Sequence, residues 1–151
     1  MTRAAIARVD PHEAAGLARL ERACFDAPWD QACLEDLLTG DLTHAWRLHV
    51  GDDAVAYVIV RVVAGEGEIL RVGVLPGHRR QGLAATLLQY AMHTLSRRLT
   101  HGLHLEVRAA NIAARALYAR LGFVESGLRT GYYAAPADDA VLMRWAPRAS
   151  A

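Results

Sequence analysis

The sequence predicts one α/β domain built on a central mixed, largely antiparallel sheet with flanking helices. Three observations predict this fold. The 151 residues match the size of one domain, and a hydrophobic fraction of 53% is ample for a core. Residues 68–108 have the pattern of strand, loop, helix and strand, which must form a right-handed parallel crossover. Apolar runs with turn signals on both sides of this unit, at residues 43–63 and 123–145, indicate antiparallel hairpins.

The N-terminal part is predicted to contain one strand and two helices. Ala4–Val9 has the pattern of a short strand. Asp10-Pro11 is a typical helix start, because Asp caps a helix and Pro fits its first turn. Apolar residues at helical spacing continue to Cys24, and Asp30 is placed to cap a second helix that runs to Leu38.

Three strands are predicted next. Thr43–Val50 and Ala54–Val63 flank the hairpin turn Gly51-Asp52-Asp53. A second turn, Gly65-Glu66-Gly67, is expected to lead into the strand Glu68–Leu75.

The crossover and the segment after it follow. An amphipathic helix is expected at Leu83–Leu95, and Gly102–Arg108 has the pattern of a strand. Asn111 is placed to cap a helix that runs to Leu121, where a glycine ends it.

The chain closes with a predicted antiparallel pair, Phe123–Tyr132 and Ala140–Trp145. Pro136 and Asp138-Asp139 are expected in the connection between these strands. The predicted order of elements is therefore β-α-α-β-β-β-α-β-α-β-β.

Composition excludes several classes of function. The net charge of +1 argues against a large nucleic-acid footprint and against a polybasic membrane anchor. No apolar run approaches the ~20 residues of a membrane span. The start of the chain, Met1-Thr2-Arg3-Ala4, is not followed by an apolar signal core. We therefore expect a soluble cytoplasmic domain that acts on neither nucleic acid nor membranes.

A metal site is not expected. Cys24 and Cys33 are the only cysteines, do not form a metal-type pair and give no sign of an oxidising compartment. His101 and His104 are close in sequence, but no neighbouring cysteine or acid completes a ligand set.

The most informative motif is the loop Arg79-Arg80-Gln81-Gly82-Leu83-Ala84, which joins a strand to a helix. Such a turn directs free backbone N–H groups and the positive end of a helix at one point, which suits a phosphate. The chain has neither GxxxxGK[ST] nor GxGxxG, so a P-loop and a Rossmann turn are not supported. The alternative is a surface turn with two solvated arginines.

Written as Arg-x-x-Gly-x-Ala, this loop resembles the acyl-CoA pyrophosphate loop of the GNAT N-acetyltransferases, Gln/Arg-x-x-Gly-x-Gly/Ala. The second half of the chain extends the resemblance with Leu105-Glu106-Val107-Arg108, Asn111, Ala116-Leu117-Tyr118 and Leu121-Gly122-Phe123, in order and at matching spacing. Ala27-Pro28-Trp29 and Arg129-x-x-Tyr132-Tyr133 also fit. The combination is most similar to the bacterial ribosomal-protein-alanine N-acetyltransferases of the RimI type.

This resemblance implies a GNAT fold, in which two parallel central strands splay apart at the acetyl-CoA site. It implies acetyl transfer from acetyl-CoA to a protein N-terminus, the alanine of a ribosomal protein, by direct attack in a ternary complex. An N-terminal amine has a pKa of about 7.7–8.0, against about 10.4 for lysine, so a modest base suffices for the first. No cysteine stands in the motif region, and a covalent acetyl-enzyme is therefore not expected.

The resemblance assigns the general base to Glu106 and the proton donor for the leaving thiolate to Tyr118. Strand alternation puts His104, Glu106 and Arg108 on one face, so an ion pair with an arginine is the alternative role for Glu106. Glu68 is a rival base, because it begins the strand before the basic loop, where the resemblance implies that some other GNAT enzymes carry their general base, and a water-mediated role for both carboxylates stays open. Periodicity alone favours a core position for Tyr118, with its hydroxyl bound to the backbone.

The resemblance also implies which residues bind acetyl-CoA. They are the strand residues Val72, Gly73 and Val74, through their backbone, and Arg79, Arg80, Gln81, Gly82, Leu83, Ala84 and Ala85 of the loop and helix start. Asn111 is assigned to the pantetheine arm as well as to the helix cap. Gly73 would permit close approach, although a β-bulge explains a glycine there equally well.

Trp29, Glu68, Tyr132 and Tyr133 are candidates for the acceptor groove. Ordinary apolar packing is the alternative for Trp29, and at least one of the two tyrosines must face outward on a strand. Two other functions stay open: a GNAT enzyme that acetylates a small amine, an antibiotic or a lysine, and a CoA-binding module without catalysis.

Overall fold

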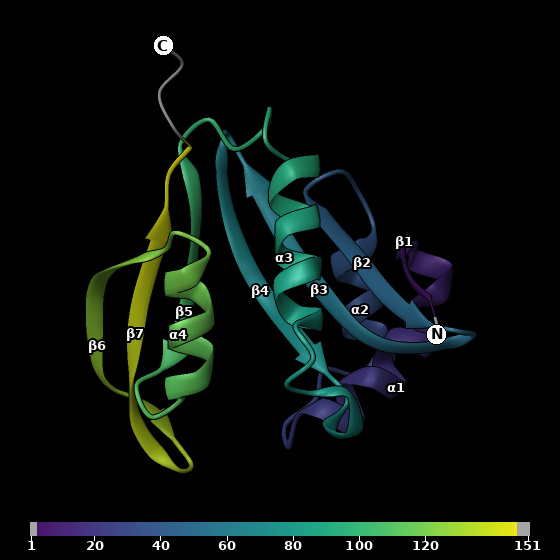
Figure 1. The fold of residues 1–151 in the computed structure, drawn as a ribbon, viewed down its shortest axis with the longest axis horizontal. Coiled ribbons are helices and arrows are strands. Elements are labelled where there is room, and N and C mark those ends of the chain that lie inside the picture. The colour runs from purple at the N-terminus through teal and green to yellow at the C-terminus, as the bar shows by residue number, and fades with distance from the viewer. Residues whose placement is uncertain (1–2, 148–151) are drawn as a thin grey trace.

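The computed structural model describes residues 3–147, so Met1 and Thr2 of the N-terminal stretch considered above lie outside it. Its elements are β1 (Ala4–Arg8), α1 (Ala14–Cys24), α2 (Gln31–Leu38), β2 (Thr43–Val50), β3 (Asp53–Val63), β4 (Glu66–Val74), α3 (Leu83–Thr94), β5 (Gly102–Arg108), α4 (Ile112–Arg120), β6 (Val124–Ala134) and β7 (Ala137–Trp145). The seven strands form one sheet in the order β1-β2-β3-β4-β5-β7-β6 (Figure 1). The predicted fold class and order of elements are confirmed.

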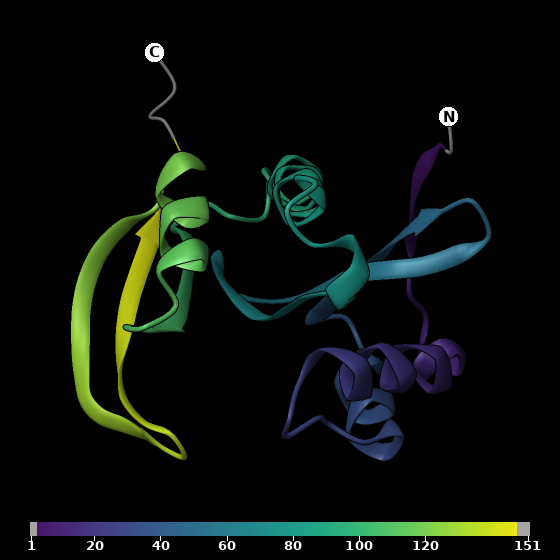
Figure 2. The same cartoon turned by 60° about the horizontal axis from the view of Figure 1, so that its bottom comes forward.

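The sheet divides at its one parallel junction. Every other neighbouring pair of strands is antiparallel, whereas β4 and β5 run parallel and pair only at Glu66–Glu68 with Gly102–His104. Beyond Glu68 the two strands diverge, and Figure 2 shows β5, β6 and β7 standing apart from β4. The splay that the family resemblance implies is therefore present.

Helices cover both faces of the sheet (Figure 2), and each face has its own apolar core. On one face, α3 and α4 pack over a cluster that includes Leu87, Leu88, Leu105, Val107 and Tyr118. On the other face, α1 and α2 pack over a second cluster that includes Leu17, Leu34, Tyr57 and Ile59. No helix within residues 3–147 combines the length and the hydropathy that crossing a bilayer requires.

The predicted helix caps are present. The Oδ1 atom of Asp30 accepts a hydrogen bond from the backbone N–H of Cys33 at 2.8 Å. The Oδ1 atom of Asn111 accepts one from Ala114 at 3.2 Å. The first helix starts differently, because a 3-10 turn, Pro11–Glu13, precedes its α-helical part.

The turn expected at Gly65-Glu66-Gly67 was placed wrongly. The turn is Ala64-Gly65, and Glu66 and Gly67 already pair with β3. The glycine at position 67 has a packing cause, because a Cβ atom there would lie 2.5 Å from the Cδ2 atom of Leu99. A glycine can thus mark a tight contact within a strand rather than a turn.

The connection between the last two strands was also predicted too long. Only Ala135-Pro136 joins β6 to β7, and Asp138 and Asp139 belong to β7. Both carboxylates accept backbone hydrogen bonds from neighbouring segments, Asp138 from Ala110 at 3.0 Å and Asp139 from Gly131 at 2.7 Å. These bonds stabilise two acids in a strand, although adjacent acids are typical of a loop.

Candidate active site

The divergence of β4 and β5 opens a cleft of about 470 Å³. The two strands line it with Ile69, Leu70, Arg71 and Val72 from β4 and Leu105, Glu106, Val107 and Arg108 from β5. Asn111, Ala114 and Tyr118 line it from α4 and its cap. The end of α1 and the loop after it complete the wall with Cys24, Phe25, Asp26 and Ala27, and the end of β6 and the β6–β7 turn do so with Tyr133, Ala135 and Pro136.

β4 presents an open edge to this cleft. Ile69 pairs with Val60 and Arg71 with Ile59, so Leu70 is an extra residue that bulges out of the ladder. Past Glu68 the opposite edge of β4 has no strand partner among residues 3–147. An edge of this kind can pair with an extended ligand that contains amide groups.

Gly73 lies beyond the bulge, and packing explains it. A Cβ atom at this position would lie 2.6 Å from the Cε1 atom of Tyr57. The Tyr57 ring therefore excludes a side chain at position 73, and the β-bulge lies three residues earlier in the strand, at Leu70.

The basic loop between β4 and α3 keeps its backbone donors free. Within the described chain, no backbone N–H from Arg79 to Ala85 has a hydrogen-bond acceptor, and the first bond of the helix joins Thr86 to Gly82 at 3.1 Å. Arg80 and Gly82 are left-handed, with φ of 63° and 76°. Gly82 is the N-cap and has no side chain to satisfy these donors. The positive end of α3 is thus open to an anion.

The two arginines of this loop differ. The Nε atom of Arg79 donates to the carbonyl of Val74 at 2.9 Å, which ties the loop to the end of β4. Arg80 and Gln81 are exposed, and their side chains have no hydrogen-bond partner within residues 3–147.

Glu106 and Tyr118 reach the cleft from opposite faces of the sheet. Leu105 and Val107 pack in the same core as Tyr118, so Glu106 between them points to the face that α1 and α2 cover. The Oε1 atom of Glu106 lies 3.4 Å from the Nη2 atom of Arg129, and a quarter of its side chain is exposed. The ion pair considered as its alternative role is therefore present, with Arg129 as the partner.

Tyr118 is 9% exposed and packs edge-on against Phe123, with ring centroids 5.8 Å apart. Burial raises the pKa of Tyr118 to about 12, so its hydroxyl keeps its proton at neutral pH. No described residue forms a hydrogen bond with this hydroxyl, and no buried side-chain oxygen among residues 3–147 lacks a partner, so the hydroxyl oxygen itself is in contact with solvent. The hydroxyl is thus free to donate into the cleft.

The other candidates divide into two groups. Asn111 and Tyr133 line the cleft. Glu68 does not, because it pairs with His104 where the two strands still form a ladder. Tyr132 is half exposed, with its ring 5.5 Å from the Cζ atom of Arg129, and Trp29 packs outside the lining.

The sequence prediction missed Glu21 and Arg71. Glu21 is completely buried and accepts hydrogen bonds from Arg71 Nε at 3.0 Å, from Arg71 Nη2 at 3.2 Å and from the Trp29 N–H at 2.9 Å. The Tyr57 hydroxyl is its fourth donor, and burial next to this carboxylate raises the pKa of Tyr57. Glu21 lies on the apolar face of α1 beside Leu17, which was the available signal.

Cys24 is a further residue that the motifs did not connect with the site. It lies far from them in sequence, yet it lines the cleft. Burial raises the pKa of the Cys24 thiol, which disfavours the nucleophilic thiolate.

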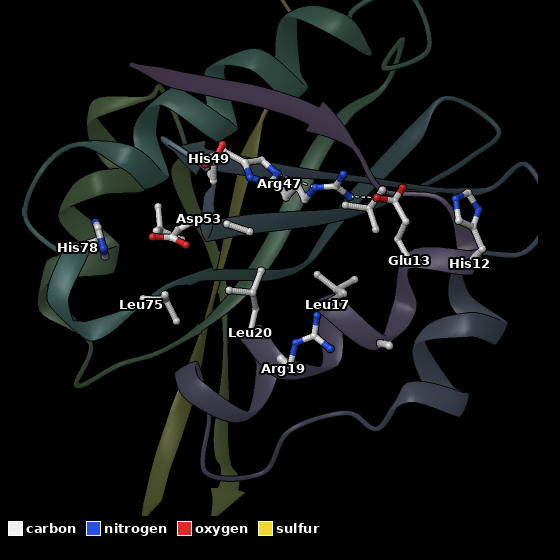
Figure 3. A pocket seen from close by; sticks show the side chains of 16 residues that line it. His12, Glu13, Leu17, Arg19, Leu20, Arg47, His49, Asp53, Leu75 and His78 are labelled. Atoms are coloured by element: carbon white, nitrogen blue, oxygen red, sulfur yellow. Dashed lines mark hydrogen bonds and ion pairs between the residues drawn. The ribbon is translucent and has the colours of Figure 1, made fainter. Parts of the chain in front are cut away.

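A larger hollow of about 840 Å³ lies between α1, β2 and β3 (Figure 3). Leu17 and Leu20 form part of its wall, and Arg47 bonds there to Glu13 and to His49. None of the residues assigned to catalysis, to acetyl-CoA or to the acceptor lines this hollow, so it is separate from the cleft.

Comparisons with known proteins agree with this geometry. The sequence model described as "Acetyltransferase (GNAT) family" matches residues 14–123. A curated relative from Escherichia coli K12, named [ribosomal protein bS18]-alanine N-acetyltransferase, is 33% identical over 126 residues, which cover 82% of this chain and 84% of the relative. A Bacillus subtilis protein with the same name, marked as putative, is 26% identical over 143 residues, which cover 94% of this chain and 95% of the relative.

Solved structures show the same likeness. The ribosomal-protein-S18-alanine N-acetyltransferase from Escherichia coli has a TM-score of 0.88 at 28% identity, over 97% of each chain. Arabidopsis thaliana NAA60 in complex with acetyl-CoA shares the fold, with a TM-score of 0.83 at 18% identity over 95% of this chain and 98% of that one.

Proposed function

Since this chain belongs to the acetyltransferase (GNAT) family and is an acyltransferase, we propose that it moves the acetyl group of acetyl-CoA to a protein N-terminal α-amine. The proposed acceptor is the N-terminal alanine of a ribosomal protein, the activity that the Escherichia coli relative has by name. The observation that best supports catalysis is the meeting of Glu106 and Tyr118 at one cleft from opposite faces of the sheet. We place the reaction in the cytoplasm, where ribosomal proteins are made.

The proposed acetyl-CoA site uses backbone more than side chains. Val72, Gly73 and Val74 lie on the open edge of β4, which can bond to the amides of the pantetheine arm. The free N–H groups from Arg79 to Ala85 suit the pyrophosphate, and the exposed Arg80 adds charge. Asn111 lines the cleft where the same arm would pass.

In the proposed reaction, Glu106 accepts a proton from the acceptor ammonium on the face of α1 and α2. The neutral amine then forms its bond to the thioester carbon, whose oxygen is stabilised by a backbone N–H of β4. As the C–S bond breaks, Tyr118 donates its proton to the departing sulfur from the face of α4, and the second proton that the nitrogen loses on becoming an amide restores the Tyr118 hydroxyl through solvent. Tyr133 and the loop Cys24–Ala27 border the side from which the acceptor approaches.

The rival enzymatic function is acetylation of a lysine or a small amine in the same cleft. A peptide panel separates the two. A peptide that begins with free alanine is expected to gain one acetyl group at its α-amine, as measured by mass spectrometry. The same peptide with a blocked N-terminus and an internal lysine is expected to stay unmodified. Efficient acetylation of that lysine would favour the rival.

Acetyl-CoA binding is tested at Gly82. A valine there would place bulk beside the free N–H groups in a left-handed conformation, so calorimetry should show a sharp loss of CoA affinity. Gly40→Val is the matched control, because Gly40 is also left-handed, with φ of 94°, and has open space around it. Equal CoA affinity for a folded Gly82→Val variant and the wild type would refute this site.

A further inference from the structure

We propose that Arg71 and Arg108 are positioning residues that hold the two walls of the acceptor side of the cleft. Each arginine lies on one of the two diverging strands, Arg71 on β4 and Arg108 on β5. Each one bonds through its guanidinium to the backbone of a different loop that lines the cleft. This inference rests on the proposed function, because it concerns the acceptor of that reaction.

Arg71 holds the loop between α1 and α2. Its Nη2 atom donates to the carbonyl of Ala27 at 3.1 Å. Its Cζ atom lies 4.2 Å from the ring centroid of Phe25 and 4.2 Å from that of Trp29, so the guanidinium contacts an aromatic ring from each end of the loop. Cation–π contacts of this kind and a charged hydrogen bond together fix the path of the loop.

The buried Glu21 explains why an arginine is needed at position 71. A carboxylate with no exposure is very unfavourable unless it is paired and fully hydrogen-bonded. Arg71 supplies the opposite charge and two hydrogen bonds, and Glu21 also accepts the backbone N–H of Trp29. The loop is thereby anchored at Ala27 through its carbonyl and at Trp29 through its N–H.

Arg108 holds the opposite wall in the same way. Its Nη1 atom donates to the carbonyl of Pro136 at 2.8 Å, and its Nη2 atom to that of Ala135 at 3.4 Å. Its Cζ atom lies 4.1 Å from the ring centroid of Tyr133. The three residues that it contacts are the ones with which this turn lines the cleft.

The divergence of the strands makes these contacts important. Past Glu68 no ladder connects β4 to β5, so each wall depends on its own strand for position. Most of β6 is exposed, as are Asp26 and Ala27 in the other loop. A shift of about 1 Å in a bound reactant can lower a rate by as much as ~10²-fold, so loosened walls should impair the acceptor more than acetyl-CoA.

The first test replaces each arginine by methionine, which keeps an unbranched apolar side chain and removes the planar guanidinium group. The substrates are acetyl-CoA and the peptide with a free N-terminal alanine. For Arg108→Met, kcat/KM for the peptide is expected to fall by roughly 10-fold or more, mainly through a higher KM, since charged hydrogen bonds of this kind contribute about that much. Affinity for CoA should stay within about twofold of wild type. Arg108→Lys should recover part of the loss, because lysine keeps the positive charge but lacks the planar set of N–H donors that bonds to two carbonyls at once.

Arg71→Met requires a second variant, because it leaves the Glu21 charge buried without its cation. Arg71→Met combined with Glu21→Gln removes both charges, and it should fold while the acceptor KM remains high. Arg144→Met is the matched control. Arg144 also bonds to a carboxylate, Glu66, and to a carbonyl, that of His101, but it lies outside the cleft.

Hydrogen exchange on the full chain tests the positioning without any turnover. The Arg71 variants should speed exchange at residues 24–29, and the Arg108 variants at residues 133–135, each without changing the other loop. If wild type does not acetylate the peptide, the proposed function fails while the exchange result still decides the positioning role. Unchanged exchange in both loops, or an unchanged KM in an active enzyme, would overturn the proposal.

Discussion

Tyr57 fills the space beside Gly73, where a Cβ atom would lie 2.6 Å from the Cε1 atom of the ring. Gly73→Ala should therefore displace Tyr57 and weaken its hydrogen bond to Glu21, at a loss of about 1–3 kcal/mol in unfolding free energy. Urea denaturation measures this loss. Gly77→Ala is the control, because a Cβ atom at Gly77 has no neighbour within 4 Å. Equal stability of the two variants would contradict the packing argument.

Tyr118→Phe removes one hydroxyl that has no hydrogen-bond partner among residues 3–147. If Tyr118 protonates the leaving sulfur, turnover should fall by ~10²–10⁴-fold, the usual contribution of general acid catalysis. Stability and CoA affinity should stay near wild type. Steady-state kinetics and calorimetry provide these values, and Tyr90→Phe on the exposed side of α3 is the control. Unchanged turnover would make Tyr118 a residue of the core alone.

Glu106→Gln keeps the shape of the side chain and removes its basicity. The rate should fall most at low pH and recover partly as the pH rises past about 7.7–8.0, where the acceptor amine loses its proton unaided. Glu68→Gln should have a smaller effect, because Glu68 does not line the cleft. Rate profiles of both variants from pH 6 to 9 decide between the two carboxylates, and a larger pH-dependent loss from Glu68→Gln would reverse the assignment.

His44 should make the fold sensitive to mild acid. It is 4% exposed, and its ring nitrogens face Arg8 at 3.2 Å and Arg98 at 3.3 Å. Burial and these two positive charges lower the pKa of His44, although Asp41 opposes the shift. The unfolded chain thus binds this proton more readily, and stability should fall as the pH drops below about 6.5.

Urea denaturation at several pH values between 5 and 8 measures this dependence. His44→Gln should flatten the slope in the acid range. His93→Gln, at an exposed position of α3, should leave it unchanged. The same slope in wild type and His44→Gln would exclude His44 as the cause.

Local signals were sufficient for most of the fold. Thr43–Val50 and Gly102–Arg108 were predicted with the bounds that the structure gives them, because turn residues flank both runs. Asp30 and Asn111 identified two helix starts through their capping side chains. The errors occurred where a residue type has two physical uses, as at Gly67, whose glycine serves packing rather than a turn.

Fewer residues of the site could be predicted from such local patterns. Glu21 and Arg71 are 50 positions apart, and an acid in a helix or an arginine in a strand is usually solvated. Only the folded chain brings them together. Cys24 reaches the cleft through the same folding, and no spacing in the sequence connects it to Glu106. The roles of Glu106 and Tyr118 came from family resemblance, since periodicity favoured a core position for Tyr118.

The short ladder between β4 and β5 has a consequence for cooperativity. Three residues on each strand form the hydrogen-bonded seam between the two halves of the sheet. Few backbone hydrogen bonds therefore connect the two halves, and the apolar core under α3 and α4, to which Ile69 and Leu105 both belong, is what else joins them on that face. An extended ligand that bonds to β4 past Glu68 would add hydrogen bonds between the two diverging strands, beyond the three paired residues. Loading the cleft would then add backbone coupling between the halves to the coupling that their shared core provides, and should raise the free energy of opening between them.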